Sequence, residues 1–209
     1  MIGLIMYNVF LVGGCCSGKS CAGRYMEELG AWRIDLDEIS RGILQTGSAV
    51  LEEVAEEFGE DIINPLTGEL NRGLLAQRAF SSDEAVARLE AIEMPAIKEE
   101  LAYILNNECC AATHPDVCVV EIPLLDRVED MLGLADEVVY VYTPLDIRYK
   151  RADLRGLSQQ DFEYRISHQP TDEYLRSHAD TIFDNAGDEL SLRAQVDLWW
   201  KAHKDNLWR

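Results

Sequence analysis

The sequence predicts an α/β fold of three layers, in which a parallel sheet lies between two layers of helices. Five short apolar segments are typical of buried strands, and they lie at residues 7–12, 32–34, 117–122, 137–142 and 181–183. Helical sequence separates these segments, and strands that alternate with helices favour a parallel sheet covered on both faces. A chain of 209 residues is long enough to form one domain with a sizeable core.

The turns that follow the strands support this order of elements. Residues 7–12 lead into Gly13-Gly14, and a helix is expected to begin near Lys19. The second strand ends in Asp35-Leu36-Asp37, and Pro123 stops the third strand. Arg-rich helical sequence separates the fourth strand from the weaker fifth strand.

The segment between the second and third strands is much longer than the crossover of roughly a dozen residues that a parallel pair needs. Apolar residues recur at three- and four-residue steps from 50 to 58, as one helix face requires. A polar turn follows at 64–68, and helical pattern continues from 72 to about 107. We therefore expect a helical insertion at about residues 40–113.

The charge of the chain excludes some classes of partner. Nineteen basic and thirty-eight acidic residues give a formal net charge of −19, which opposes binding to nucleic acid and to anionic membranes. The sequence has neither an apolar run of the roughly 18 to 20 residues that a membrane span needs nor the pattern of a signal peptide. A cytoplasmic protein without nucleic-acid or membrane partners is expected.

The cysteines indicate reduced thiols rather than a metal site. Six cysteines stand at positions 15, 16, 21, 109, 110 and 118, with no C-x-x-C pair and no histidine at the spacing of a zinc finger. Reduced thiols are the rule in cytosolic proteins.

Residues 13–20 match the motif G-x-x-x-x-G-K-[ST] at every required position, after a predicted strand and before a predicted helix. The backbone N–H groups of such a loop and the helix N-terminus hold a polyanion. Lys19 should reach the β- and γ-phosphates of a nucleoside triphosphate, and the Ser20 hydroxyl should bind Mg²⁺. The residues expected to bind the nucleotide here are Gly14, Cys15, Cys16, Ser17, Gly18, Lys19, Ser20 and Cys21.

Carboxylates follow two of the strands, at the sheet edge where ligands of α/β proteins bind. In an extended chain Asp35 and Asp37 share one face, so that one could deprotonate an acceptor hydroxyl while the other supports metal or orientation. Solvated turn carboxylates are the alternative. Glu121, near the end of the third strand, is a candidate for binding Mg²⁺ through water, or else a capping or exposed acid.

Cations are scarce in this chain, so their clustering is informative. Arg148, Arg151 and Arg155 lie at i, i+3 and i+7, on one helical face. We interpret about residues 148–170 as a lid whose arginines close over the triphosphate and exclude water. A solvated helix face is the alternative.

The motifs of this chain, taken in their order along the sequence, resemble those of the dephospho-CoA kinase family across nearly the whole chain. Residues 11–20 resemble its phosphate loop, and residues 34–37 with Arg41 resemble its I-D-A-D-x-x-x-R segment. Later matches are Phe58-Gly59, the G-x-L-N-R element at 68–72, Leu75-Ala76 with Phe80, Pro123-Leu124-Leu125, Arg151 with Arg155, Arg165-Ile166 with Gln169, and Ala179-Asp180 through Asp184-Asn185 with Gly187.

The resemblance implies a P-loop core, a helical substrate-binding portion and an arginine lid. It implies that Asp37 is the general base, that Arg155 lies near the transferred phosphate, and that Arg151 and Asn185 belong to the nucleotide site, with Asn185 near the adenine. For the acceptor it implies Asp35, Arg41, Asn71, Arg72 and Leu124. The implied reaction is transfer of the γ-phosphoryl of ATP, with Mg²⁺, to the ribose 3′-hydroxyl of dephospho-CoA.

The chain departs from the family pattern at several positions. Val12 replaces a threonine, and Cys15 and Cys16 replace an isoleucine and a glycine of the loop. In the segment L-N-x-x-x-H-P, Glu90 stands for the asparagine and Met94 for the histidine. These changes leave open a kinase of another small nucleotide or nucleoside, and a nucleotide-binding regulatory protein is a third hypothesis. The presence of Lys19, Ser20, Asp37 and Arg155 argues against a protein without catalysis.

Overall fold

A computed structural model of the chain describes residues 6–108 and 116–207. Cys109 and Cys110 lie outside the described residues, while Cys15, Cys16, Cys21 and Cys118 are free thiols. The chain divides into two compact units. The core unit consists of Met1–Asp35 and Leu105–Arg209, and the helical unit consists of Leu36–Ile104.

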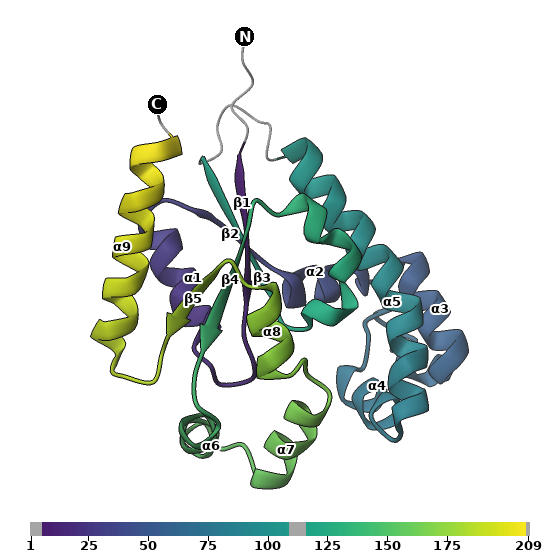
Figure 1. Cartoon of the computed structure of the whole chain (residues 1–209). Coiled ribbons are helices and arrows are strands. Elements are labelled where there is room, and N and C mark those ends of the chain that lie inside the picture. The colour runs from purple at the N-terminus through teal and green to yellow at the C-terminus, as the bar shows by residue number, and fades with distance from the viewer. Residues whose placement is uncertain (1–5, 109–115, 208–209) are drawn as a thin grey trace. The chain divides into compact units, whose positions relative to one another are not determined.

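The described part of the core unit contains a sheet of five strands in the order β2-β3-β1-β4-β5, and all neighbouring strands are parallel (Figure 1). The strands are β1 Tyr7–Val12, β2 Trp32–Asp35, β3 Val117–Ile122, β4 Glu137–Tyr142 and β5 Thr181–Asp184. The predicted α/β fold with a parallel sheet is confirmed. The second and fifth strands extend one residue further than predicted, to Asp35 and Asp184.

The helices divide between the two units. The core unit holds α1 Lys19–Glu28, η3 Leu125–Arg127, η4 Glu129–Leu134, α6 Leu145–Leu154, α7 Gln159–Ser167, α8 Asp172–His178 and α9 Glu189–Leu207. The helical unit holds α2 Leu36–Ile43, α3 Ala49–Phe58, η1 Glu60–Ile62, α4 Arg72–Ala79 and α5 Asp83–Tyr103. A short π-helix, η2 Ile104–Glu108, follows α5. Among the described residues, no helix combines the length and the apolar character that a membrane span requires.

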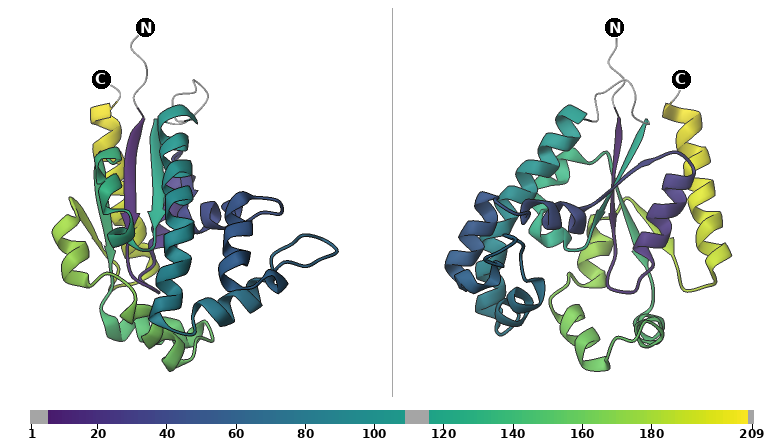
Figure 2. Two further views of the ribbon diagram at one scale, coloured as in Figure 1. Left: turned by 90° about the vertical axis from the view of Figure 1, so that its right-hand side faces the viewer. Right: turned by 180° about the vertical axis from the view of Figure 1, so that it is seen from behind.

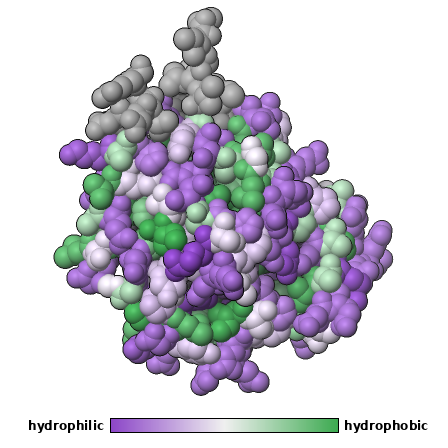
Figure 3. Space-filling model, viewed as in Figure 1, coloured by the Kyte–Doolittle hydropathy of each residue, from purple (hydrophilic) through white to green (hydrophobic). Residues whose placement is uncertain are grey.

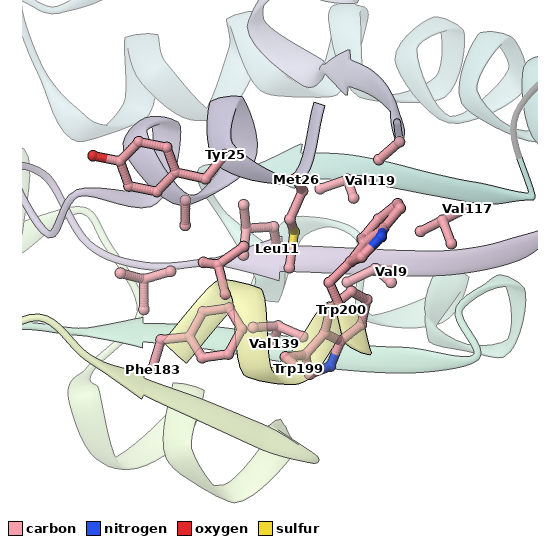
Figure 4. Packing of buried hydrophobic residues seen from close by; sticks show 14 of the residues in the cluster. Val9, Leu11, Tyr25, Met26, Val117, Val119, Val139, Phe183, Trp199 and Trp200 are labelled. Carbon is pink, nitrogen blue, oxygen red and sulfur yellow. The ribbon is translucent and has the colours of Figure 1, made fainter. Parts of the chain in front are cut away.

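The core unit buries both faces of its sheet. On one face α1 and α9 lie side by side over the strands, as the view from behind shows (Figure 2), and α8 contacts β4 on the opposite face (Figure 1). Alternate residues of each strand point to opposite faces. Val9, Val119 and Val139 therefore pack against Met26 of α1 and Trp199 of α9 (Figure 4). Each fully buried large apolar side chain contributes about 1.5–3 kcal/mol, so this packing stabilises the association of α1 and α9 with the sheet.

The surface of the molecule is largely polar in the view of Figure 3. Most residues on the face shown in Figure 3 are hydrophilic, and hydrophobic residues form scattered groups on it. Single exposed apolar side chains such as Leu154 and Leu190 are ordinary on protein surfaces.

The helical unit has a core of its own. The predicted apolar face of residues 50–58 is buried at Leu51, Val54, Ala55 and Phe58. The helical pattern from 72 to about 107 forms two α-helices rather than one, since α4 ends at Ala79 and the side chain of Ser82 caps α5 by accepting a hydrogen bond from Ala85 N. The predicted polar turn at 64–68 is present between η1 and α4.

Candidate active site

The loop between β1 and α1 has the backbone that its glycines predict. Gly18, just before α1, has φ 94° and ψ 13°, a left-handed conformation that glycine adopts without a steric penalty. Cys16 also has a positive φ, of 61°, which is uncommon for a residue with a side chain. Glycine at this position would avoid that strain, so the substitution of Cys16 for the glycine of the family pattern has a conformational cost.

Three side chains hold the Ser17 carbonyl from the rest of the core unit. Its oxygen accepts hydrogen bonds from Asn185 Nδ2 at 2.7 Å, Thr143 Oγ1 at 2.7 Å and Arg151 Nη1 at 3.3 Å. Arg151 Nη2 also donates to the Asn185 backbone oxygen at 2.9 Å. Asn185 and Thr143 are buried, so the peptide that precedes Gly18 is held in one orientation.

A second group of side chains holds the loop at Cys15. Arg148 Nε donates to the Cys15 carbonyl oxygen at 2.8 Å, and the Cys15 N–H donates to Gln169 Oε1 at 2.7 Å. Arg148 is only 6% exposed, and a Cβ added to Gly14 would lie 2.3 Å from its Nη2. The alternative of a solvated arginine face is therefore wrong for Arg148.

Arg155 and the two loop thiols form a looser group. Arg155 Nη1 lies 3.9 Å from Cys16 Sγ, and the sulfur atoms of Cys15 and Cys16 are 3.8 Å apart. Burial, followed by the neighbouring Cys16 thiol, raises the pKa of Cys15 above its ordinary value. The Cys15 side chain is consequently kept as a neutral thiol at physiological pH.

The two residues predicted to bind Mg²⁺ meet directly. Ser20, the second residue of α1, donates its hydroxyl proton to Glu121 Oε2 at 2.8 Å. Arg33 Nε donates to the other oxygen, Glu121 Oε1, at 2.6 Å. Glu121 is 1% exposed, so the alternative of an exposed acid is wrong, and α1 begins after Gly18 without a side-chain cap. A hydroxyl and a carboxylate are oxygen ligands of the kind that Mg²⁺ takes together with phosphates and water.

The predicted carboxylate pair lies on two different elements. Asp35 is the last residue of β2 and pairs in register with Glu121, whereas Asp37 lies in the first turn of α2. The expectation that the two share one face of an extended chain is therefore wrong, because the chain turns into a helix at Leu36. The acidic side chains of Asp37 and Glu38 suit that position, since they face the positive end of the helix dipole.

Comparison with known proteins identifies the family. The family model for dephospho-CoA kinase matches residues 7–190. A dephospho-CoA kinase from Corynebacterium diphtheriae is 41% identical over 196 residues, which cover 93% of this chain and 96% of that protein. The chain belongs to the dephospho-CoA kinase family. The resemblance seen in the motifs is confirmed.

Solved structures confirm the fold of this dephospho-CoA kinase family member. A dephospho-CoA kinase from Campylobacter jejuni has a TM-score of 0.63 at 24% identity and covers 95% of this chain and 97% of its own. A shikimate kinase from Bacteroides thetaiotaomicron has a TM-score of 0.55 at 16% identity and covers 95% of this chain and 99% of its own. At these identities the similarity establishes the α/β fold of P-loop kinases.

Family membership decides between the three hypotheses of the sequence analysis. Dephospho-CoA kinases transfer a phosphoryl group from ATP to dephospho-CoA in the last step of coenzyme A biosynthesis, and the chain is a kinase of this reaction. Nothing in the comparisons favours another acceptor or a protein without catalysis. The departures at Val12, Glu90 and Met94 therefore occur within the family.

The residues that the resemblance assigned to the acceptor lie in both units. In the helical unit Arg72 Nη2 donates to the Arg41 carbonyl oxygen at 3.3 Å, and Asn71 caps α4 by accepting from Leu74 N at 3.1 Å. Leu124 lies in the core unit, between β3 and η3. Asn71 therefore has a structural role as the N-cap of α4. The role of Arg41, Asn71, Arg72 and Leu124 in acceptor binding remains a prediction.

Several residues of the site were not among the predicted binding or catalytic residues. Thr143, Gln169 and Arg148 bond to the loop, and Arg33 bonds to Glu121. A signal existed for two of them. Arg33 precedes Asp35 by two residues in an extended segment, which places both on one face, and Gln169 lies in the R-I-x-x-Q motif.

Proposed function

We propose that the chain transfers the γ-phosphoryl group of ATP to the ribose 3′-hydroxyl of dephospho-CoA with Asp37 as general base and Ser20 and Glu121 at the Mg²⁺ site. The contact between Ser20 Oγ and the buried Glu121 carboxylate, at 2.8 Å beside the start of α1, is the observation that carries this proposal. Mg²⁺, when bound, would neutralise charge on the β- and γ-phosphates. We expect the reaction to take place in the cytoplasm.

Asp37 accepts the proton of the acceptor hydroxyl as the acceptor oxygen bonds to the γ-phosphorus. The bond between that phosphorus and the oxygen bridging it to the β-phosphorus breaks, and ADP leaves with this electron pair. Lys19 and Arg155 stabilise the negative charge that spreads over the transferring group. The position of Asp37 supports the assignment, because it follows the carboxyl end of β2 by two residues and side chains at that edge of a parallel sheet serve ligands.

The loop residues from Gly14 to Cys21 are proposed to hold the triphosphate. The bonds to the Ser17 carbonyl support an additional part for Arg151 and Asn185, which would keep the loop in shape as well as border the nucleotide. Asp35, Arg41, Asn71, Arg72 and Leu124 remain our proposal for the acceptor site.

The insertion and the lid are likewise proposals. The segment at about 40–113 would bind the substrate as part of a single kinase domain. Because Arg148, Arg151 and Gln169 already bond to the loop backbone, we expect closure of the lid at about 148–170 to move mainly the part between Leu154 and Gln169.

The assignment of the base is tested by replacing Asp37 with asparagine, which is nearly isosteric but cannot take the proton. Asp37→Asn should lower the single-turnover rate by about 10² to 10⁴ at saturating ATP and dephospho-CoA, with ATP affinity preserved. Asp35→Asn is the matched control, with a smaller effect or an altered Mg²⁺ dependence. If Asp35→Asn proves the more damaging change at saturating Mg²⁺, Asp37 is not the base.

A coupled assay of ADP release tests the acceptor. Dephospho-CoA should support turnover, and a panel of nucleosides and nucleotides at the same concentration should not. Turnover with another acceptor but none with dephospho-CoA would contradict the proposed reaction.

A further inference from the structure

Glu121 is a buried carboxylate that needs a cationic partner. It is 1% exposed, and charged groups are buried in proteins only where they are paired and hydrogen-bonded. Ser20 supplies a hydroxyl to Oε2, and Arg33 supplies a guanidinium N–H to Oε1 at 2.6 Å. Arg33 is therefore a cationic group in direct contact with this carboxylate.

The sheet brings Arg33 and Glu121 to the same face. In the parallel pair of β2 and β3, Arg33 lies opposite Val119 and Asp35 lies opposite Glu121. Since residues two apart on a strand point to one side, Arg33, Asp35 and Glu121 all point to the face that α1 covers. The pairing is thus a property of the strand register.

Helix α1 leaves space for this ion pair at a glycine. A Cβ added to Gly23 would lie 2.5 Å from Glu121 Oε1 and 3.2 Å from Arg33 Nε. A contact of 2.5 Å is too short for any side chain, so Gly23 allows the helix to pack directly over the two charges. The Ser20 hydroxyl, one turn earlier on α1, reaches Glu121 because of this close approach.

The guanidinium of Arg33 is held in one orientation by its other contacts. Its Nη1 lies 3.8 Å from Glu27 Oε2 and its Nη2 lies 3.9 Å from Asp35 Oδ2. The planar fork of an arginine can serve three carboxylates at once, whereas the ammonium group of a lysine is a point charge. Arg33 consequently holds Glu121 through Oε1, whereas Ser20 contacts Oε2.

We propose that Arg33 is a positioning residue of the phosphate site, which fixes Glu121 Oε1 so that Oε2 stays directed at the Ser20 hydroxyl. The inference rests on the proposed function of Ser20 and Glu121 at the Mg²⁺ site. When a residue that hydrogen-bonds to a metal ligand is replaced, metal affinity or activity typically falls by about 10- to 100-fold. Arg33 would thus affect the binding of ATP with Mg²⁺ and leave metal-free binding of ATP almost unchanged.

The test is calorimetric titration of the full chain with ATP, once with excess Mg²⁺ and once with EDTA. Arg33→Gln should weaken ATP binding with Mg²⁺ by about 10- to 100-fold and change binding in EDTA by less than about twofold. Arg33→Lys should recover part of the loss because it keeps the charge. Arg193→Gln is the matched control, since Arg193 forms ion pairs with Glu28 and Asp197 on the surface of the same unit, and it should change neither affinity.

Two outcomes for Arg33→Gln overturn the inference. The first is an unchanged affinity for ATP with Mg²⁺. The second is an equal loss of ATP affinity with Mg²⁺ and with EDTA, which would mean that Arg33 only stabilises the fold. Glu121→Gln separates this failure from failure of the proposed Mg²⁺ site. If Glu121→Gln loses affinity with Mg²⁺ and Arg33→Gln does not, only the part of Arg33 is wrong, and if neither loses it the Mg²⁺ site is wrong as well.

A variant at Gly23 gives an independent measurement if Arg33→Gln does not fold. Gly23→Ala places a methyl group against Glu121 Oε1 and should reproduce the selective loss of affinity with Mg²⁺. An alanine variant that folds and binds ATP with Mg²⁺ like the unaltered chain would also overturn the inference.

Discussion

Replacing Gly18 with alanine should destabilise the core unit through two separate effects. The left-handed backbone at φ 94° is unfavourable for any residue with a Cβ, at a cost of about 1–2 kcal/mol. The new Cβ would lie 2.1 Å from Asn185 Nδ2, so Asn185 has to move and give up its hydrogen bond to the Ser17 carbonyl. Loss of that bond costs about 0.5–1.5 kcal/mol, and both effects together give about 1.5–3.5 kcal/mol.

Thermal unfolding measures this cost. For a chain of this size each kcal/mol lowers Tm by about 2–4 °C, so Gly18→Ala should lower Tm by about 3–14 °C. In an Asn185→Ala background the contact with Asn185 is absent, and the same change should cost only the backbone part, about 1–2 kcal/mol. Gly133→Ala is the matched control in the core unit, because no atom lies within 4 Å of its added Cβ.

Two results would refute this reasoning. An unchanged Tm for Gly18→Ala would mean that the loop tolerates a side chain at this position. An equal cost with and without the Asn185 side chain would mean that Asn185 does not pack against Gly18.

Two further predictions concern Thr143 and Glu93. Thr143→Val removes the hydroxyl that donates to the Ser17 carbonyl, but that oxygen keeps Asn185 and Arg151 as donors. The free energy of unfolding should therefore fall by only about 0.5–1.5 kcal/mol, and Thr143→Ser should restore it. A denaturant titration that gives a loss above about 3 kcal/mol would contradict the expectation that the two remaining donors compensate. Burial raises the pKa of Glu93 from 4.5 to about 7, against a smaller lowering by Arg72. A raised pKa means that the contribution of Glu93 to stability is fully present below its unfolded pKa and is lost as pH rises through about 7. Glu93→Gln should therefore equal the unaltered chain in stability near pH 4.5 and exceed it increasingly up to about pH 8, whereas a difference independent of pH in denaturant titrations would be evidence against a buried carboxyl.

The strands and the phosphate loop could be predicted because their signals are local. The apolar runs at 7–12, 117–122 and 137–142 have the same bounds in the structure, since a strand buried on both faces is continuously apolar and ends where glycine, proline or polar residues begin. The glycine of the loop motif indicates the loop's conformation, because Gly18 has a positive φ that glycine adopts without a steric penalty. The phosphate site and the kinase class were therefore accessible from a few consecutive residues.

Other features of the site were not accessible in this way. Asp35 and Asp37 would share a face only if the strand continued past Leu36, and in the structure α2 begins at that residue. The sequence does not reveal this boundary, because acidic residues are compatible both with the end of a strand and with the first turn of a helix. The burial of Arg148 could not be predicted from the sequence either, because an arginine on a helix is exposed in most proteins. It is buried here because it packs against the phosphate loop and donates to the Cys15 carbonyl oxygen.

The sequence by itself determined the parallel α/β fold, the phosphate loop with Lys19 and Ser20, and the family. Only the tertiary structure decided that β3 lies between β1 and β2, and with this order it placed Glu121 within reach of both Ser20 and Arg33. Thr143 and Asn185 reach the Ser17 carbonyl from β-strand ends more than a hundred residues away for the same reason. Contacts between residues so distant in the chain depend on which strands are neighbours and in which register they pair, and that follows from the packing of the whole core rather than from any local pattern.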